Sequence, residues 1–497
     1  MAPPKKMAVI IGAGPAGLTA GYELLKTQKF STEIIEKDNQ IGGLAKTVTY
    51  KNYKYDIGPH HYITESKEIE KWWKNIISED EFIKLNRFTR IYYNKHFFLY
   101  PLQPINALMG LSPFESIHCV SSYFRYKLWP KKVNSYEDWL SNRFGKRLFE
   151  IFFKSYTEKL WGIKCDQISA DWAAQRIKNF SLGKAMFFAF FGKLFKKYTP
   201  RTILGEFYYP IYGAGTLWDN VGKKIVDSEY GAIHTNKKVM SIEHDGKSIL
   251  AVLTKNMPAE SQHAENQHSE TQHMAQKLTR HNGDYFLSTM TLRDLVLNMD
   301  PIAPKEVIAA ATQLRCRALI TLNLIIDKEK ITPDHWLYIH EKSVRTIRIG
   351  NMNNFSAKLR PNKNHSAISL ECFTFTDEPF WTKSDEELLE QAKLEIDKIG
   401  LVKKELIIDG MVLRIPDAYP IYEGNYKEHL NIVYNYLGQF KNLKLMGRNG
   451  MHQYNNMDTA MLSAMKAVDE IISYEDKYKT KINLKTKTQK HSEAQLN

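Results

Sequence analysis

The sequence predicts an α/β fold in which a parallel-sheet domain, a mainly helical insertion and a mainly antiparallel sheet domain share one chain. Three observations predict it. A short apolar run near the N-terminus ends in glycines, a long segment with helical spacing follows, and several strand-like runs occupy the second half. With 497 residues, the chain is long enough for about two to four domains.

Composition indicates an ordinary folded protein. Hydrophobic residues make up 43% of the chain and charged residues 25%, which excludes a disordered, collagen-like or disulfide-scaffold protein. The four cysteines lie far apart, so we expect a reducing, cytoplasmic location. No apolar run approaches ~20 residues, so we expect no membrane span. The net charge of +14 is spread along the chain without a nucleic-acid-binding motif, so we expect no nucleic acid partner.

The N-terminal segment predicts one βαβ unit. Residues 7–12 (MAVIIG) are a short apolar run typical of a buried parallel strand, and residues 14–29 follow with helical spacing. Residues 32–36 (TEIIE) form a second strand-like run. Two short parallel strands joined by a helix are the supersecondary unit of Rossmann-like sheets.

The glycines of this unit form a dinucleotide-binding fingerprint. Gly12, Gly14 and Gly17 make a GxGxxG pattern between strand and helix, and Glu36 ends the next strand about twenty residues on. Gly12 permits the tight turn, Gly14 lets the backbone approach a pyrophosphate, and Gly17 lets the helix pack closely. The helix N-terminus then offers free N–H groups to the phosphates. Glu36 would accept hydrogen bonds from a ribose.

The residues that follow favour FAD over NAD as the dinucleotide. Gly42 and Gly43 make a second glycine turn close behind Glu36, and Gly58 lies in a third turn, DIGPHH. The chain is similar here to FAD proteins of the glutathione-reductase type, in which such a turn lets the backbone pass the flavin side of the cofactor. That similarity implies FAD.

Seven short segments, in order along the chain, resemble one group of flavoproteins. They are GAGPAGL (12–18), IGG (41–43), YTEKLWG (156–162), WAAQRI (172–177), YPIYGAGTLW (209–218), AYPIY (418–422) and GRNGMHQYNNMD (447–458). The chain resembles the flavin-dependent amine oxidase and protoporphyrinogen-oxidase-like superfamily, and within it most closely the UDP-galactopyranose mutases. The last segment is the most specific, because it matches the order and spacing of a GR-x-G…Y-x-x-x-D segment in those mutases.

The resemblance implies a set of residues for each ligand. The cofactor-binding candidates are Gly12, Gly14, Pro15, Ala16, Gly17, Glu36, Lys37, Gly43, Leu44, Gly58, Val239, Gly447, Arg448 and Met457. The substrate-binding candidates are Tyr156, Trp161, Arg176, Arg348, Tyr419, Tyr454 and Asp458. Arg176 and Arg348 would bind a diphosphate through their planar guanidinium groups, with Arg345 as the competitor of Arg348. The catalytic candidates are Arg348 and a histidine beside the flavin, which is either His60 or His61.

The resemblance also implies an activity and leaves two alternatives open. The implied activity is the isomerisation of a nucleotide sugar between pyranose and furanose forms, by nucleophilic catalysis at N5 of reduced FAD, which needs an electron donor. The first alternative is an oxidoreductase that removes hydride from an amine, a porphyrinogen-like ring or a lipid. This alternative predicts an apolar cavity without paired arginines. The second is a non-catalytic flavoprotein that binds a partner or a membrane.

Changes in composition and hydrophobic spacing along the chain suggest the domain boundaries. We expect the FAD-binding domain to be assembled from residues 7–65, 202–300 and 431–475, with a mainly helical domain at 66–201, a sheet substrate domain at 301–430 and a disordered basic tail at 476–497. Residues 457–473 have the spacing of an amphipathic helix. Residues 256–281 are low in complexity and predict a solvated insertion.

Two further patterns have less specific interpretations. His263, His268, His273 and His281 suggest a metal, but the spacing of five is poor for shared ligation and no acid or cysteine completes a set, so we expect no metal site. The basic and aromatic stretches 124–132 and 184–198 fit a peripheral membrane contact. Packing on a neighbouring helix or on a second subunit explains them equally simply, and the oligomeric state stays open.

Overall fold

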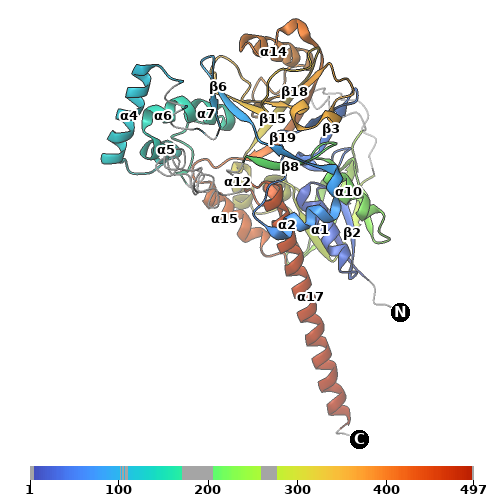
Figure 1. Ribbon diagram of the computed structural model, residues 1–497. Helices are drawn as coiled ribbons and strands as arrows, with labels where there is room; N and C mark the ends of the chain where they lie inside the picture. The colour runs from blue at the N-terminus through green and yellow to red at the C-terminus, as the bar shows by residue number, and fades with distance from the viewer. Residues whose placement is uncertain are drawn as a thin grey trace.

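The computed structural model describes residues 5–100, 102, 106, 110–170, 205–258 and 277–494, with side chains of the last helix described as far as Lys477. A five-stranded parallel sheet in the order β20-β13-β1-β2-β9 forms one layer of the molecule (Figure 1). Its strands are β1 (Lys6–Ile11), β2 (Phe30–Ile35), β9 (Gly231–His234), β13 (Tyr285–Ser288) and β20 (Leu443–Leu445). Three separated parts of the chain therefore contribute to one sheet.

The central strand β1 is buried on both faces, which explains its apolar sequence. Ala8 and Ile10 belong to one core, and Val9 and Ile11 belong to another. Three helices share the first core: α1 (Pro15–Lys26), which contacts both of the others, α10 (Thr216–Val226) and α17 (Met457–Ala494). Burial on both faces is the usual state of a parallel sheet and accounts for the run MAVII.

A seven-stranded sheet in the order β19-β15-β18-β17-β16-β6-β7 forms the second layer. Its strands are β6 (Thr89–Tyr93), β7 (His96–Leu99), β15 (Cys316–Ile326), β16 (Trp336–Ile339), β17 (Arg348–Asn351), β18 (Ser366–Thr374) and β19 (Ile407–Pro420). Every neighbouring pair is antiparallel except β16 and β6, which are parallel. The mainly antiparallel sheet expected from the sequence is therefore present, and α14 (Asp385–Lys398) packs against β15 and β19.

The segment expected to be mostly helical is helical only in part. Its described helices are α2 (Lys67–Ile76), α4 (Pro113–Leu128), α5 (Tyr136–Phe144), α6 (Lys146–Phe149) and α7 (Ser155–Trp161). Residues 82–99 contain β5 (Phe82–Asn86), which pairs with β8 (Glu206–Pro210), and the sheet strands β6 and β7, so the expectation was wrong there. The reason is composition, because Phe, Ile and Tyr fit a strand once a partner edge is available.

Smaller elements complete the structure. The strands are β3 (Thr47–Tyr50), β4 (Tyr53–Asp56), β10 (Lys237–His244), β11 (Ile249–Asn256), β12 (Thr279–Asn282) and β14 (Met299–Asp300). The helices are α11 (Leu292–Leu297), α12 (Lys305–Gln313), α13 (Met352–Phe355), α15 (Tyr426–Leu437) and α16 (Gly447–Gly450). Of these strands, β10, β11, β12 and β14 form one four-stranded sheet.

The C-terminal segment corrects the predicted disordered tail. Helix α17 continues to Ala494 and projects away from the body of the molecule (Figure 1). The segment contains no glycine or proline and is rich in lysine, so nothing in its backbone interrupts the helix. Across the described residues, no helix is both long and apolar enough to cross a bilayer.

Candidate functional site

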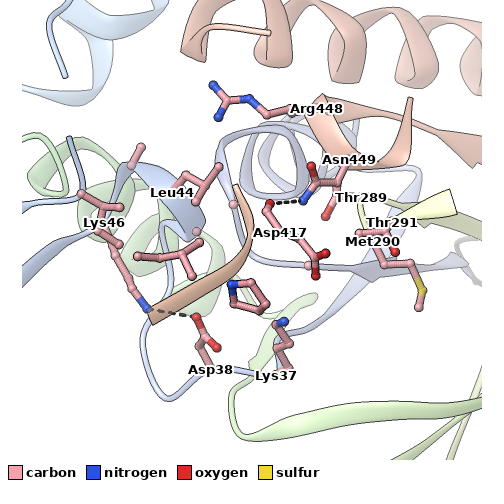
Figure 2. A pocket seen from close by; sticks show the side chains of 18 of the residues that line it. Lys37, Asp38, Leu44, Lys46, Thr289, Met290, Thr291, Asp417, Arg448 and Asn449 are labelled. Carbon is pink, nitrogen blue, oxygen red and sulfur yellow. Dashed lines mark hydrogen bonds and ion pairs between the residues drawn. The ribbon is translucent and has the colours of Figure 1, made fainter. Parts of the chain in front are cut away.

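A cavity of about 1540 Å³ lies between the carboxyl edge of the parallel sheet and the seven-stranded sheet. This volume exceeds the ~300–1,000 Å³ of ordinary small-molecule pockets, so it has room for a dinucleotide and a second ligand. Every cofactor-binding candidate except Gly17 lines it. Figure 2 shows Lys37, just after β2, Asp417, in β19, and Arg448, in the short helix α16, around this space.

The glycine turns make one end of the cavity from backbone alone. A Cβ on Gly17 would lie 1.9 Å from the Gly12 carbonyl oxygen, which explains why this glycine packs helix on strand and does not line the cavity. A Cβ on Gly43 would lie 2.9 Å from the Gly14 Cα, so the two glycine turns touch. Helix α1 begins there, and no acidic residue lies in its first turn. The positive end of its dipole is therefore open to an anion.

The ribose acid predicted by the fingerprint is held in place by backbone. Glu36 accepts hydrogen bonds from the N–H groups of Ala13 (2.6 Å) and Asp38 (3.0 Å). Burial raises the pKa of Glu36 above its ordinary value. Lys37 is exposed, and the neighbouring protein atoms that partly desolvate its ammonium act against its charge, but Asp38 and Asp417 raise its pKa. Both residues line the cavity, as does Val239.

The two candidate histidines line the cavity at the turn that contains Gly58. The His60 Nε2 atom lies 2.7 Å from the Leu44 carbonyl oxygen, which ties this turn to the second glycine turn. The His61 ring stacks on Trp336 at 5.8 Å. Burial lowers the pKa of each histidine to about 4, so both are neutral at pH 7. The structure therefore keeps both as candidates.

The structure places Arg348, and not Arg345, at the cavity. Arg348 lines it from β17, whereas the Arg345 guanidinium donates to Glu378 (2.8 Å). Arg348 is directly opposite Glu371 in the register of β17 and β18, and its Nε donates to that carboxylate at 2.7 Å. Burial disfavours its charge, but Glu371 raises the pKa of Arg348 well above the ordinary value.

Arg448 contributes a second guanidinium that is held by backbone carbonyls. Its Nη1 donates to the Ala418 oxygen (3.0 Å) and its Nη2 to the Asn455 oxygen (2.6 Å), and it forms no ion pair with a described residue. The rings of Tyr419 and Tyr454 stack on each other at 5.2 Å, and the guanidinium lies over both. Arg448 therefore presents positive charge beside two tyrosines at the cavity wall.

The remaining substrate candidates divide into three groups. Tyr454 and Asp458 line the cavity, as do Arg348 and Tyr419. Trp161 and Tyr156 lie behind this lining, with Trp161 edge-on to Tyr419 at 6.1 Å and Tyr156 near Tyr338 at 5.6 Å between ring centres. Arg176 lies outside the described residues.

Sequence reasoning missed several residues of the cavity. Thr289, Met290 and Thr291 follow β13, the strand next to β1 (Figure 2). The rule that ligands bind at the carboxyl ends of parallel strands could have found them from the run YFLSTM. Trp336, which lines the cavity and stacks on His61, carried no signal. Neither did Glu371, because only the pairing of β17 and β18 brings it to Arg348.

Of the four histidines that suggested a metal, one lies in the described part of the chain. His281 lies in β12 and contacts Glu33 (2.8 Å) and Thr254 (2.9 Å), whereas His263, His268 and His273 lie outside the described residues. Within the described ranges, no group of three or more His, Cys, Asp or Glu side chains could hold a metal ion.

Comparisons with known proteins match both the nucleotide-binding segment and the whole fold. The family described as an NAD(P)-binding Rossmann-like domain matches residues 10–76. The crystal structure of a reduced UDP-galactopyranose mutase superposes with a TM-score of 0.77 at 18% identity, covering 95% of this chain and 96% of that one. A putative protoporphyrinogen oxidase from Exiguobacterium superposes with a TM-score of 0.67 at 17% identity, covering 94% and 99%. The chain has the fold of these proteins.

A curated relative supports the same superfamily over a shorter span. The chain is 25% identical over 174 residues to the probable UDP-galactopyranose mutase of Klebsiella pneumoniae, which is 33% of this chain and 43% of that protein. The aligned segment therefore spans less than half the length of the relative. These matches agree with the superfamily that the sequence motifs indicate.

Proposed function

We propose that this chain is an FAD-dependent enzyme that acts on a nucleotide sugar and exchanges its pyranose and furanose forms. The proposal combines two features of the large cavity. One end is a backbone cradle next to a helix N-terminus, and the other carries guanidinium groups and stacked tyrosines. The likeness to a UDP-galactopyranose mutase supports the assignment.

The residues at the glycine turns fit FAD. The contact between Gly43 and Gly14 leaves no space for side chains where a pyrophosphate would pass, and the first turn of α1 carries no acid. Glu36 stands at the distance along the chain expected for a ribose partner. Bound FAD in its reduced form would supply the nucleophile for opening and reclosing the sugar ring. The chain itself would bind, orient and exclude water.

The observation that carries the substrate proposal is the stacked pair of Tyr419 and Tyr454, over which lies the guanidinium of Arg448, the residue that the resemblance assigns to the cofactor. Arg448 is bonded to carbonyls alone among the described residues, so its charge is not neutralised by a carboxylate. A diphosphate would supply the missing negative charge, and tyrosine hydroxyls can add hydrogen bonds to its oxygens. Arg348 adds a second guanidinium at the same cavity. In an enzyme for an apolar substrate, we would expect apolar side chains in place of these arginines and tyrosines.

One observation favours the oxidoreductase as a second candidate. The Arg348 charge is compensated by the buried carboxylate of Glu371, which reduces the net positive charge of the wall. The likeness to a putative protoporphyrinogen oxidase agrees with this alternative. On this reading the substrate would be less anionic than a diphosphate.

An anaerobic assay separates the two candidates. The flavin-loaded protein is reduced, incubated with UDP- and dTDP-sugars, and the products are separated by chromatography. A new sugar isomer without net flavin oxidation supports the mutase. Reduction of the oxidised flavin by an amine, a porphyrinogen or a lipid, with no sugar product, contradicts it.

Matched arginine variants locate the diphosphate. In protein that is still loaded with FAD, Arg448→Met should weaken nucleotide-sugar binding about tenfold to 100-fold, because hydrogen bonds to charged groups contribute about 1.5–3 kcal/mol. Arg345→Met removes an arginine that bonds to Glu378 outside the cavity and should leave the affinity unchanged. Equal losses in both variants would contradict the assigned site.

A further inference from the structure

Helix α4 turns an apolar face outward. Phe114, Ile117, Val120, Phe124 and Leu128 are spaced three or four residues apart, and all five side chains are exposed. Phe114 is 86% exposed, and Trp129, directly after the helix, is 73% exposed. Single exposed apolar residues are ordinary, but a continuous stripe along four turns marks an interaction surface. We call these six residues the α4 stripe.

The stripe is not the packing face of the helix. Cys119 and Tyr126 lie on the opposite side and are buried. The backbone of α4 also approaches the next helices closely, because a Cβ on Gly145 would lie 2.6 Å from the Tyr123 nitrogen. Figure 1 shows α4 at the outer end of the helical group, with α5 and α6 beside it. The helix is therefore fixed to the protein by one face and presents the α4 stripe with the other.

Positive charges border the stripe. At ~100° per residue, Arg125 and Lys127 fall on its opposite flanks, and Lys131 and Lys132 follow Trp129. None of these four side chains forms an ion pair with a described residue. The acid in this helix, Glu115, binds Arg147 (2.7 Å), which lies in α6. The outer surface of α4 is therefore apolar in the middle and cationic at its edges.

We propose that the α4 stripe docks this protein onto the surface of a bilayer that contains anionic phospholipids. Phenylalanine, leucine and tryptophan on one face with lysine and arginine beside them is the composition of helices that lie in the headgroup layer. Anionic headgroups attract basic residues next to such a helix. A second copy of this chain fits less well, because the acid of α4, Glu115, already binds Arg147, so the same helix of a partner offers no free carboxylate to the four cations.

Vesicle sedimentation with the full-length protein tests the proposal. One vesicle population is phosphatidylcholine alone, and the other contains one third phosphatidylglycerol. The partition coefficient should be at least about tenfold higher for the anionic vesicles and should fall as salt is raised. No sedimentation with anionic vesicles, or equal sedimentation with both populations, would overturn the proposal.

Two variants and one control separate the apolar and the electrostatic contributions. Phe114→Ser/Phe124→Ser/Trp129→Ser should lower partitioning on anionic vesicles at least about tenfold. Arg125→Gln/Lys127→Gln/Lys131→Gln/Lys132→Gln should remove most of the preference for them. Ile302→Ser, at a side chain that is 81% exposed elsewhere, should change neither. Undiminished vesicle binding by the triple variant would overturn the proposal. It would also be overturned if the original protein bound no vesicles and formed a dimer, while the triple variant was a monomer.

Discussion

The two ends of the cavity are built in different ways. At the glycine end the surface is backbone: Gly14 and Gly43 touch, and the N-terminus of α1 faces the space. At the sheet end the surface is side chain, with Arg348, Tyr419 and Arg448 brought together from three separated segments. The first end depends on the absence of side chains, and the second on charges that are held by specific partners.

Because of this difference, the two ends of the cavity should be sensitive to different kinds of substitution. A Cβ added at Gly17 or Gly43 would overlap backbone atoms of the other glycine turns, which cannot move aside as a flexible side chain can. A side chain removed at the sheet end leaves its partner buried and unpaired, as Glu371 would be without Arg348. Substitutions at the glycine end should therefore weaken ligand binding, whereas substitutions at the sheet end should lower both the stability of the protein and its affinity for the ligand.

The largest expected effect is at the buried ion pair. Arg348→Met leaves the Glu371 carboxylate, which is 1% exposed, without its cation and should destabilise the protein by about 3–5 kcal/mol. Arg348→Met/Glu371→Leu should recover most of that stability without recovering nucleotide-sugar affinity. Urea unfolding and a ligand titration measure the two quantities. If the double variant binds as well as the original protein, Arg348 does not contact the diphosphate.

The next effect is at the glycine end. Gly43→Val should weaken FAD binding at least about 100-fold, or about 2.8 kcal/mol, because its side chain would occupy the contact with Gly14. Gly400→Val is the matched control, since Gly400 also has a positive φ (+74°) but nothing within 4 Å of its added Cβ. Flavin absorbance after gel filtration reports both. Flavin loss in the control as well would mean that backbone strain, and not crowding, is responsible.

A smaller effect concerns acid stability. Burial lowers the pKa of His340, beside Tyr156, to about 3, below the ordinary 6.5. Between these values the unfolded chain binds a proton that the folded chain does not, so stability should fall as the pH falls from about 6.5. His340→Phe should reduce the loss between pH 7 and 5 by about 1–2 kcal/mol. Urea midpoints at the two pH values test this, and an unchanged slope would contradict it.

The smallest effect distinguishes the cavity wall from the layer behind it. Tyr454→Phe removes a hydroxyl at the cavity and should weaken nucleotide-sugar binding about threefold to tenfold with little change in stability. Trp161→Phe removes volume behind Tyr419, where the side chain is 2% exposed, and should lower stability more than affinity. The reverse pattern would place Trp161 in direct contact with the ligand.

The sequence predicted the glycine end well because its signal is local. The apolar run, the GxGxxG turn and Glu36 lie within about thirty residues, and each has a direct physical reason. The strands at 82–99 and the helical tail were missed, because composition alone does not show which partner edge or helix an ambiguous segment joins.

The sheet end was predictable only through resemblance. Motif matching identified Tyr419, Arg448 and Tyr454, but it could not show that Glu371 faces Arg348 across two strands. It also left Arg345 and Arg348 in competition until the fold placed Arg348 at the cavity. Contacts between residues far apart in sequence depend on strand register, which a single sequence does not state.

Equilibrium titration of the flavin-free protein with FAD tests the central claim most directly. The account predicts saturable uptake of one FAD per chain, visible as a yellow protein that keeps its absorbance through gel filtration. A protein that remains colourless after incubation with excess FAD, while still folded by circular dichroism, would contradict it.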